Sequence, residues 1–365
     1  MESRRRSDDA CITLRQRALP LGDRGIGAGT LKFSALSDIA PIMGAYLLLG
    51  AGFSRNWGGW LASEVFEYLL GCPEVATNDE LRRLLWRAQS RGGFEVALSD
   101  LQGEAESNAS AKDILQRLES VVVGMFDEMN RGLEAGSWEF SNIVENSVSK
   151  FLTKFDAIFT LNQDLLLECR YLNSSPELHR PDRWVGVGMP GVHPGEPRAS
   201  IVGQRWEILR EDNFKIDGRI QPYFKLHGSS NWNAPDGSAT LIMGGNKLGA
   251  IGGSPILAWY QREFEERLNS GDARLMIIGY GFRDQHINEV VVKAVLDRGL
   301  KMFVVAPEGA EIARAANSSG GAAIYAPSSL DDAFERGLLG ASRRGLSEIF
   351  SGGSELTKLY RFLDS

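Results

Sequence analysis

The sequence contains only three cysteines among 365 residues, and Cys11, Cys72 and Cys169 lie far apart. An odd number of widely spaced cysteines excludes a disulfide framework and a zinc site built from four cysteines. The four histidines are scattered as well, so no tetrahedral metal site of the usual spacing can be drawn. We therefore expect no structural metal.

Long apolar runs and an excess of positive charge are also missing. No apolar run is long enough to span a bilayer, and the N-terminus shows no signal-peptide pattern. The formal net charge of −7 argues against binding nucleic acid through bulk electrostatics. These absences predict a cytoplasmic protein that neither inserts into a membrane nor binds nucleic acid directly.

A glycine turn follows the first apolar run of the chain. Residues 46–49 have the pattern of a buried strand, Gly50-Ala51-Gly52 ends it, and helical spacing of apolar residues begins near Trp60. Glycine lets a backbone approach a ligand closely, and free N–H groups at a helix start favour a phosphate. On its own the turn is weak evidence, because a plain tight turn has the same pattern.

Strand and helix patterns alternate along the rest of the chain. The helical pattern from about residue 60 to 148 is uninterrupted, which indicates an insertion after the first strand. The alternation predicts an α/β fold with a mostly parallel, doubly wound sheet, whose ligand lies beyond the carboxyl ends of the strands. Four predicted strands end in residues that suit a binding site: Gly50–Gly52, Thr160–Asp164, His227–Ser229 and Gly279–Asp284.

The same patterns suggest the domain organisation. Residues 1–38 mix charge and glycine with few spaced apolar positions, so we expect an N-terminal arm. The main domain is expected over 39–330 and a C-terminal helical segment over 331–365. Shorter features are expected within these ranges: irregular structure over 173–218 that can include a hairpin, a glycine-rich loop over 243–253 and a short strand at Ala322–Tyr325.

The four strand ends, in this order, resemble the SIR2 (sirtuin) family over roughly residues 40–310, apart from the helical insertion. The family's Gly-Ala-Gly-x-Ser, Thr-x-Asn-x-Asp, Leu-His-Gly and late glycine turn match Gly50–Ser54, Thr160–Asp164, Leu226–Gly228 and Gly279–Gly281. The resemblance implies an inverted Rossmann-like parallel sheet with a helical insertion lobe.

The resemblance also implies roles for these residues, because the family binds NAD and breaks its nicotinamide–ribose bond. Backbone N–H groups of Gly50, Ala51 and Gly52 would hold the diphosphate. Asn162 would contact the nicotinamide ribose and a water, Asp164 the nicotinamide amide, and His227 would act as general base. An imidazole suits that role, since it can accept a proton near pH 7. Further NAD-binding residues implied by the motifs are Ser54, Thr160, Gly279 and Gly281.

Several of these residues also have structural explanations. Asn162 could cap the helix that starts near Leu165, and Asp164 could neutralise the N-terminus of that helix. His227 could cap a turn. We interpret Asp284 as the N-cap of the next helix, just before His286. Trp57 and Trp60 either cover the cofactor or fasten a helix to the sheet, and His179 and His193 are expected at the surface.

The chain departs from zinc-bound deacylase sirtuins. It has no Cys-x-x-Cys pair, and Asn56–Trp60 replaces the family's Gly-Ile-Pro-Asp-Phe-Arg loop. It looks more like the zinc-free SIR2-like NADases of bacterial anti-phage defence, which carry helical insertions and deplete NAD in the infected cell. The resemblance implies an NAD⁺ glycohydrolase with NAD as substrate, a HerA-type ATPase or other defence partner, and a homo-oligomer. The alternatives are an NAD-dependent protein deacylase and a non-catalytic sensor of NAD or ADP-ribose.

Overall fold

The computed structural model describes residues 44–172, 180–195, 200–237, 239–242, 244, 247–313 and 328–364. The N-terminal arm, the strand expected at Ala322–Tyr325 and His179 lie outside the described residues.

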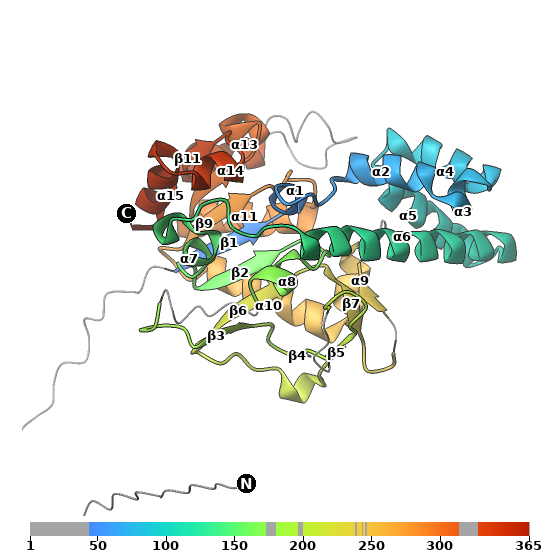
Figure 1. The fold of residues 1–365 in the computed structure, drawn as a ribbon, viewed down its shortest axis with the longest axis horizontal. Coiled ribbons are helices and arrows are strands. Elements are labelled where there is room, and N and C mark those ends of the chain that lie inside the picture. Colours follow the sequence, from blue (N-terminus) through green and yellow to red (C-terminus); the bar gives the residue numbers. More distant parts are fainter. Residues whose placement is uncertain are drawn as a thin grey trace, which may run out of the picture. The chain divides into compact units, whose positions relative to one another are not determined.

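A sheet of seven parallel strands forms the centre of the fold, in the order β11-β10-β9-β1-β2-β6-β3 (Figure 1). Leu47–Leu49 of β1 and every residue of β2 are buried, as expected for central parallel strands covered on both faces. The α/β Rossmann-like fold predicted from the sequence is confirmed. The strands are β1 (Ala45–Leu49), β2 (Ala157–Thr160), β3 (Gly186–Gly188), β6 (Ile220–Lys225), β9 (Arg274–Ile278), β10 (Lys301–Val305) and β11 (Leu338–Ser342).

Helices flank this sheet: α10 contacts β6, α13 contacts β10 and β11, and α15 contacts β11. None of the helices in the described ranges is both long and apolar enough to cross a membrane. The helices outside the insertion are α1 (Ala51–Arg55), α7 (Val148–Leu152), α8 (Leu166–Arg170), α9 (Lys247–Gly253), α10 (Pro255–Leu268), α11 (Gln285–Arg298), α13 (Ser328–Gly337), α14 (Leu346–Phe350) and α15 (Ser354–Asp364). The 3₁₀ turns are η1 (Val144–Asn146), η3 (Glu211–Asn213) and η4 (Gly309–Glu311).

The strand register aligns the carboxyl ends of the central strands. Leu49 pairs with Thr160 and with Ile278, and Thr160 pairs with Lys225. From β1 the chain continues to β2 and β6 on one side and later returns to β9 on the other side. The ends of β1 and β9 therefore form the topological switch point, where open α/β sheets bind their ligands.

The insertion between β1 and β2 is helical. Asn78 and Asn108 precede α4 and α6, and each side-chain oxygen accepts two N–H groups of the first helical turn. α5 packs along α4 and α6, and α6 also contacts α8 beside the sheet (Figure 1). The helices of this lobe are α2 (Ala62–Gly71), α3 (Pro73–Ala76), α4 (Asp79–Gln89), α5 (Phe94–Ala105) and α6 (Ala109–Ala135).

Three local expectations were wrong. The predicted glycine-rich loop over 243–253 includes helix α9, and the predicted irregular segment over 173–218 includes β3, an edge strand of the sheet. The C-terminal segment is not purely helical, because β11 pairs with β10. β11 is short and contains Gly340, so its sequence has no alternating strand pattern. Glycine is required at this position because a Cβ on Gly340 would lie 2.6 Å from the ring of Phe303.

A second sheet contains β4 (Val192–His193), β5 (Trp206–Ile208), β7 (Gly228–Asn233) and β8 (Ala239–Leu241).

Three glycines allow the turns after β1 and β9 to pack backbone against backbone. A Cβ on Gly50 would lie 2.6 Å from the carbonyl oxygen of Gly279, and a Cβ on Gly52 would lie 2.8 Å from its Cα. Gly279 itself has φ of +67°, and a Cβ there would lie 2.2 Å from the nitrogen of Phe53. Packing alone therefore demands glycine at these positions.

We expect Gly279→Ala to lower the free energy of unfolding by at least about 1–3 kcal/mol, because positive φ and backbone overlap both penalise a Cβ. Gly281→Ala is the matched control, since Gly281 is exposed and no atom lies closer than 4.0 Å to the added carbon. Urea unfolding followed by circular dichroism measures both. Equal midpoints for wild type and Gly279→Ala would show that the two turns can separate freely.

Candidate functional site

The turn after β1 offers fewer free donors than the sequence predicts. The N–H of Gly50 donates to the carbonyl of Ile278 (3.0 Å), and that of Gly52 donates to the carbonyl of Gly279 (2.9 Å). Two of the three N–H groups predicted to hold a diphosphate thus donate to backbone carbonyls of β9 and the turn after it, and diphosphate binding by Gly50 and Gly52 stays a prediction. The N–H of exposed Ala51 has no partner among the described residues, so diphosphate binding stays a prediction for Ala51.

Asn162 joins the ends of β2 and β1. Its Nδ2 donates to the carbonyl of Gly50 (3.0 Å) and to the hydroxyl of Ser54 (3.0 Å), and its N–H donates to Thr160 Oγ1 (3.0 Å). Ser54 and Thr160 are both 2% exposed, so they position Asn162 and offer little surface to a ligand. Asn162 does not cap α8. Its amide oxygen has no partner among the described residues and is the atom left for a ribose hydroxyl or a water.

Asp164 serves the start of α8. Its Oδ1 accepts the N–H of Leu166 (3.0 Å), and the side chain is largely buried. This is the structural role that the sequence leaves as an alternative, and negative charge near a helix N-terminus is favourable. Contact of Asp164 with the nicotinamide amide stays a prediction.

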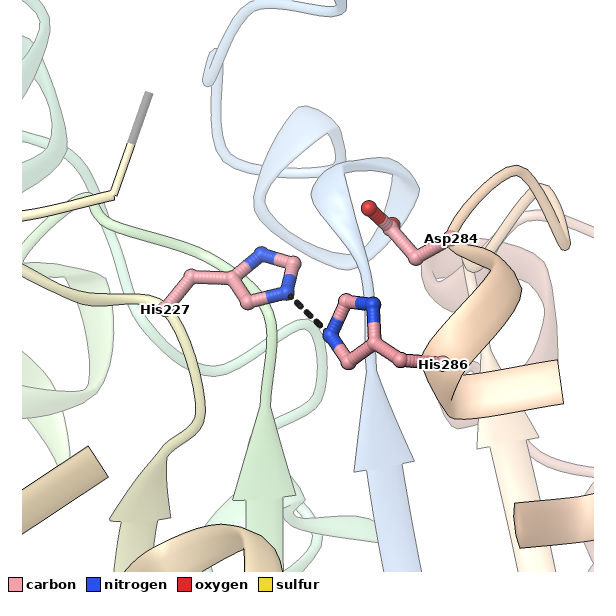
Figure 2. A group of neighbouring side chains, drawn as sticks. All are labelled: His227, Asp284 and His286. Carbon is pink, nitrogen blue, oxygen red and sulfur yellow. Dashed lines mark hydrogen bonds between the residues drawn. The ribbon is translucent and has the colours of Figure 1, made fainter. Parts of the chain in front are cut away.

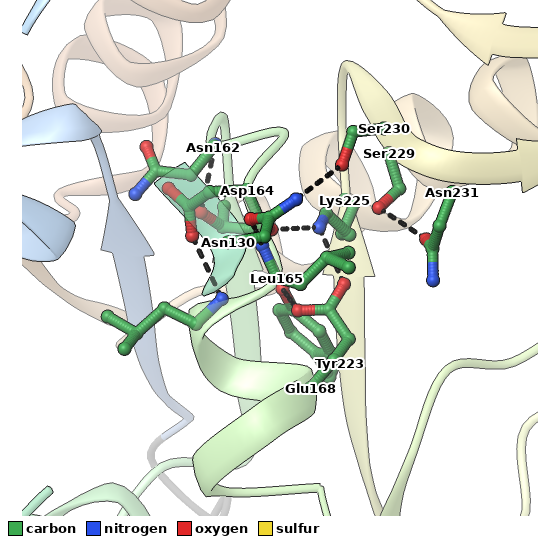
Figure 3. A network of polar contacts seen from close by, with 12 residues as sticks. Asn130, Asn162, Asp164, Leu165, Glu168, Tyr223, Lys225, Ser229, Ser230 and Asn231 are labelled. Atoms are coloured by element: carbon green, nitrogen blue, oxygen red, sulfur yellow. Dashed lines mark hydrogen bonds and ion pairs between the residues drawn. The ribbon is translucent and has the colours of Figure 1, made fainter. Parts of the chain in front are cut away.

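A buried ion pair between Lys225 and Glu168 holds the loop at Asp164 in place (Figure 3). Lys225 Nζ donates to Glu168 Oε1 and to the carbonyl of Asp164, both at 2.5 Å, and both charged side chains are fully buried. Burial raises the pKa of Glu168, and the charge of Lys225 opposes that rise. A lysine inside an apolar strand and a glutamate inside a leucine-rich helix are the sequence signals of this ion pair, because buried charges require partners.

The helical lobe reaches the same loop through Asn130 of α6. Its Oδ1 accepts the N–H of Leu165 (2.8 Å), and its Nδ2 donates to Ser230 Oγ (3.2 Å) of β7. Asn130 is 1% exposed, so its amide groups are satisfied only by this docking. The lobe therefore contacts the segments at the carboxyl ends of the central strands.

The imidazole of His227, just after β6, meets residues that follow β9. Its Nε2 lies 3.1 Å from Nε2 of His286 (Figure 2). The carboxylate of Asp284 lies within 4.8 Å of ring nitrogens of both histidines. Lys247 Nζ donates to Asp284 Oδ1 (2.8 Å) and pairs with Glu95 Oε2 (2.9 Å) of α5. This chain of contacts links the lobe to the sheet edge.

This cluster bears on two interpretations. Asp284 occupies the N-cap position of α11, but its side chain makes no capping hydrogen bond and pairs with Lys247. His227, Asp284 and His286 form a group of three potential metal ligands that their spacing in the sequence does not indicate. The ammonium of Lys247 already supplies positive charge beside Asp284. The absence of a structural metal stays a prediction.

The tryptophans after the glycine turn have structural roles. Trp57 donates its Nε1–H to the carbonyl of Trp138 (2.8 Å) and stacks on that ring at 4.7 Å. Trp60 packs on Tyr68 with 4.5 Å between ring centroids. These contacts fasten the turn to the insertion. His193 is exposed in β4, as predicted.

Burial controls the charge state of the cluster. It lowers the pKa of His227 to about 3, against the attraction of Asp284, and it also lowers the pKa of His286. For Asp284, burial opposes ionisation, but the positive charge of Lys247 and its hydrogen bond to the carboxylate favour it, and the pKa is lowered. At pH 7 both imidazoles are neutral and Asp284 is ionised.

The folded protein should lose stability as the pH falls below about 6.5, the pKa of histidine in an unfolded chain. Between this value and about 3, unfolded His227 binds a proton that folded His227 does not, so stability rises with pH in this window. A tenfold difference in proton affinity corresponds to about 1.4 kcal/mol, so the full loss is a few kcal/mol. Urea midpoints at several pH values for wild type and His227→Gln measure it. Identical pH dependence of the two proteins would contradict the assigned cause.

The comparisons with known proteins agree with the fold. A SIR2-like domain model matches residues 156–324. The match includes Asn162, His227 and Gly279, whereas the glycine turn after β1 and the insertion precede it. It supports a place in the SIR2-like family and a function related to NAD. None of the curated proteins searched matches the chain.

Several polar groups at the carboxyl ends of the central strands are free to bind a ligand such as NAD. The N–H of Ala51, the amide oxygen of Asn162 and Nδ1 of His227 have no partner among the described residues. Gly281 is exposed and packing does not require a glycine there, so its contact with NAD stays a prediction. These four groups follow β1, β2, β6 and β9, which are neighbours in the sheet.

Proposed function

We propose that the protein is an NAD⁺ glycohydrolase that converts NAD and water to nicotinamide and ADP-ribose. The observation that carries the proposal is the neutral, buried imidazole of His227, placed at the same sheet edge as the free amide oxygen of Asn162. The match to a SIR2-like domain supports NAD as the substrate. A binding module has no need of a base at this position.

In the proposed reaction the bond between nicotinamide and C1′ of the ribose breaks, and nicotinamide leaves with the electron pair. Positive charge develops on the ribose, and a water attacks C1′ and loses a proton. His227 accepts that proton, while the amide oxygen of Asn162 accepts a hydrogen bond from the water or from a ribose hydroxyl. General-base assistance of this kind is typically worth about 10²–10⁴-fold.

Product analysis with purified protein distinguishes this function from its rivals. The proposal predicts nicotinamide and ADP-ribose from NAD alone. A deacylase would require an acetyl-lysine peptide and yield O-acetyl-ADP-ribose, and a sensor would bind NAD and return it unchanged. Release of nicotinamide only with peptide, or none at all, would overturn the hydrolase.

We infer from the resemblance to zinc-free SIR2-like NADases that the hydrolase acts as an NAD-depleting effector of anti-phage defence. A homo-oligomer and a HerA-type ATPase or other defence partner belong to the same proposal. Cells that carry the wild-type protein should lose NAD after phage infection, whereas cells that carry His227→Ala should keep it. Equal NAD levels in both would contradict the defence role, and the proposed hydrolase would then rest on the assay with purified protein.

A further inference from the structure

We propose that His286 is a positioning residue that holds His227 in the tautomer whose Nδ1 is free to accept a proton. The inference rests on the proposed function, in which His227 is the general base, and adds a partner and a specified nitrogen atom. It assigns a role to the Asp284-x-His286 segment that follows the β9 turn.

The contact between the two rings restricts their tautomers. The two Nε2 atoms lie 3.1 Å apart in a buried site, so one of them carries a hydrogen and the other accepts it. If His286 donates, His227 accepts at Nε2, carries its own hydrogen on Nδ1 and offers no lone pair to a substrate. If His227 donates, its Nδ1 is a free acceptor. The proton positions of the two rings are therefore coupled.

Asp284 selects the second arrangement. Its carboxylate lies within 4.8 Å of a ring nitrogen of each histidine, and in Figure 2 the nitrogen of His286 that does not face His227 lies toward Asp284. Negative charge there favours a hydrogen on Nδ1 of His286, which leaves Nε2 of His286 as an acceptor. His227 then donates its Nε2–H. Which imidazole nitrogen carries the proton is commonly set by the partner of the other nitrogen.

The surrounding charges keep this arrangement intact. Lys247 of α9 pairs with the carboxylate of Asp284 (2.8 Å) and is itself held by Glu95 of α5 (2.9 Å). Glu289 of α11 acts electrostatically on His286. When Nδ1 of His227 takes a proton from water, the resulting imidazolium still donates its Nε2–H to neutral His286. The negative charge of Asp284 stabilises that cation.

Nitrogen NMR of the protein labelled with ¹⁵N-histidine tests the tautomers directly, and only four histidines contribute signals. The spectra of His227→Gln and His286→Gln assign the two rings. We expect the Nε2–H tautomer for His227 and the Nδ1–H tautomer for His286 at pH 7. The reverse pair of tautomers would overturn the proposal, whether or not the protein cleaves NAD.

Kinetics of two His286 variants test the consequence. In His286→Gln the side-chain carbonyl can still accept from His227, whereas His286→Leu fills the space without an acceptor. We expect His286→Leu to lower kcat about 10- to 100-fold with little change in KM, and His286→Gln to recover most of that loss. Both should be folded by circular dichroism.

Two kinetic outcomes would contradict the proposal. Equal loss in both variants would show that His286 only fills space, and wild-type rates in His286→Leu would show that it is dispensable. An inactive wild-type protein would instead count against the proposed hydrolase, because the NMR measurement of the tautomers does not depend on turnover.

Discussion

His227→Ala is expected to lower the rate of NAD cleavage by about 10²–10⁴-fold, the usual contribution of a general base. Burial lowers the pKa of His227 to about 3, so the imidazole is neutral at pH 7 and its lone pair is free, and bound NAD must raise this pKa for the full general-base effect. The loss should appear in kcat. NAD binding should persist in part, because other strand ends also contribute to the site. Wild type and His227→Ala consuming NAD at equal rates would show that His227 is not the base.

Asn162→Ala is expected to lower the rate of NAD cleavage about as much as His227→Ala does, but for a different reason. The variant loses the amide oxygen that orients the water or ribose, and it also leaves the carbonyl of Gly50 and the hydroxyl of Ser54 without their donor. An unsatisfied buried group costs about 1–3 kcal/mol, so this variant should also unfold at lower urea concentration. Ser54→Ala is the matched control, because it removes one of these contacts and leaves the amide oxygen in place.

Lys225→Met should cause the largest loss of stability, about 3–5 kcal/mol, because it leaves Glu168 as an unpaired buried carboxylate. The variant also frees the carbonyl of Asp164, which Lys225 holds at 2.5 Å. Urea unfolding at pH 7 measures the change.

The double variant Lys225→Met with Glu168→Leu separates burial of charge from loss of packing. Replacing both partners removes the uncompensated charge, so much of the stability should return. A single variant as stable as wild type would show that the pair contributes nothing. A double variant no better than the single one would place the loss in packing around Tyr223, whose hydroxyl lies 3.4 Å from Glu168.

The carboxyl ends of the strands were predictable because local sequence patterns mark them. Each apolar run stops at a motif residue, and parallel register then brings Asn162 and His227 to one edge. The partners of these residues were not predictable. His227 and His286 are 59 positions apart, and Asn130 lies 35 residues before Leu165. No periodicity or motif spacing reports contacts between residues that only the folded chain brings together.

The glycine motif shows a different limit. Gly50 and Gly52 suggest a phosphate site from the sequence, yet their N–H groups donate to Ile278 and Gly279. A tight approach of two backbones and a tight approach of a ligand both require glycine, so the residue type cannot separate them. The contacts that a Cβ added at each position would make do separate the two causes, and they distinguish Gly52 from Gly281.

Hydrolysis of NAD in ¹⁸O-labelled water by wild type and His227→Ala is the decisive test of the proposed hydrolase. We predict equimolar nicotinamide and ADP-ribose from the wild-type protein without any peptide, with one ¹⁸O atom on the anomeric carbon, and only a small residual rate for His227→Ala. NAD returned unchanged by the wild type, or ADP-ribose formed equally by both proteins, would contradict it.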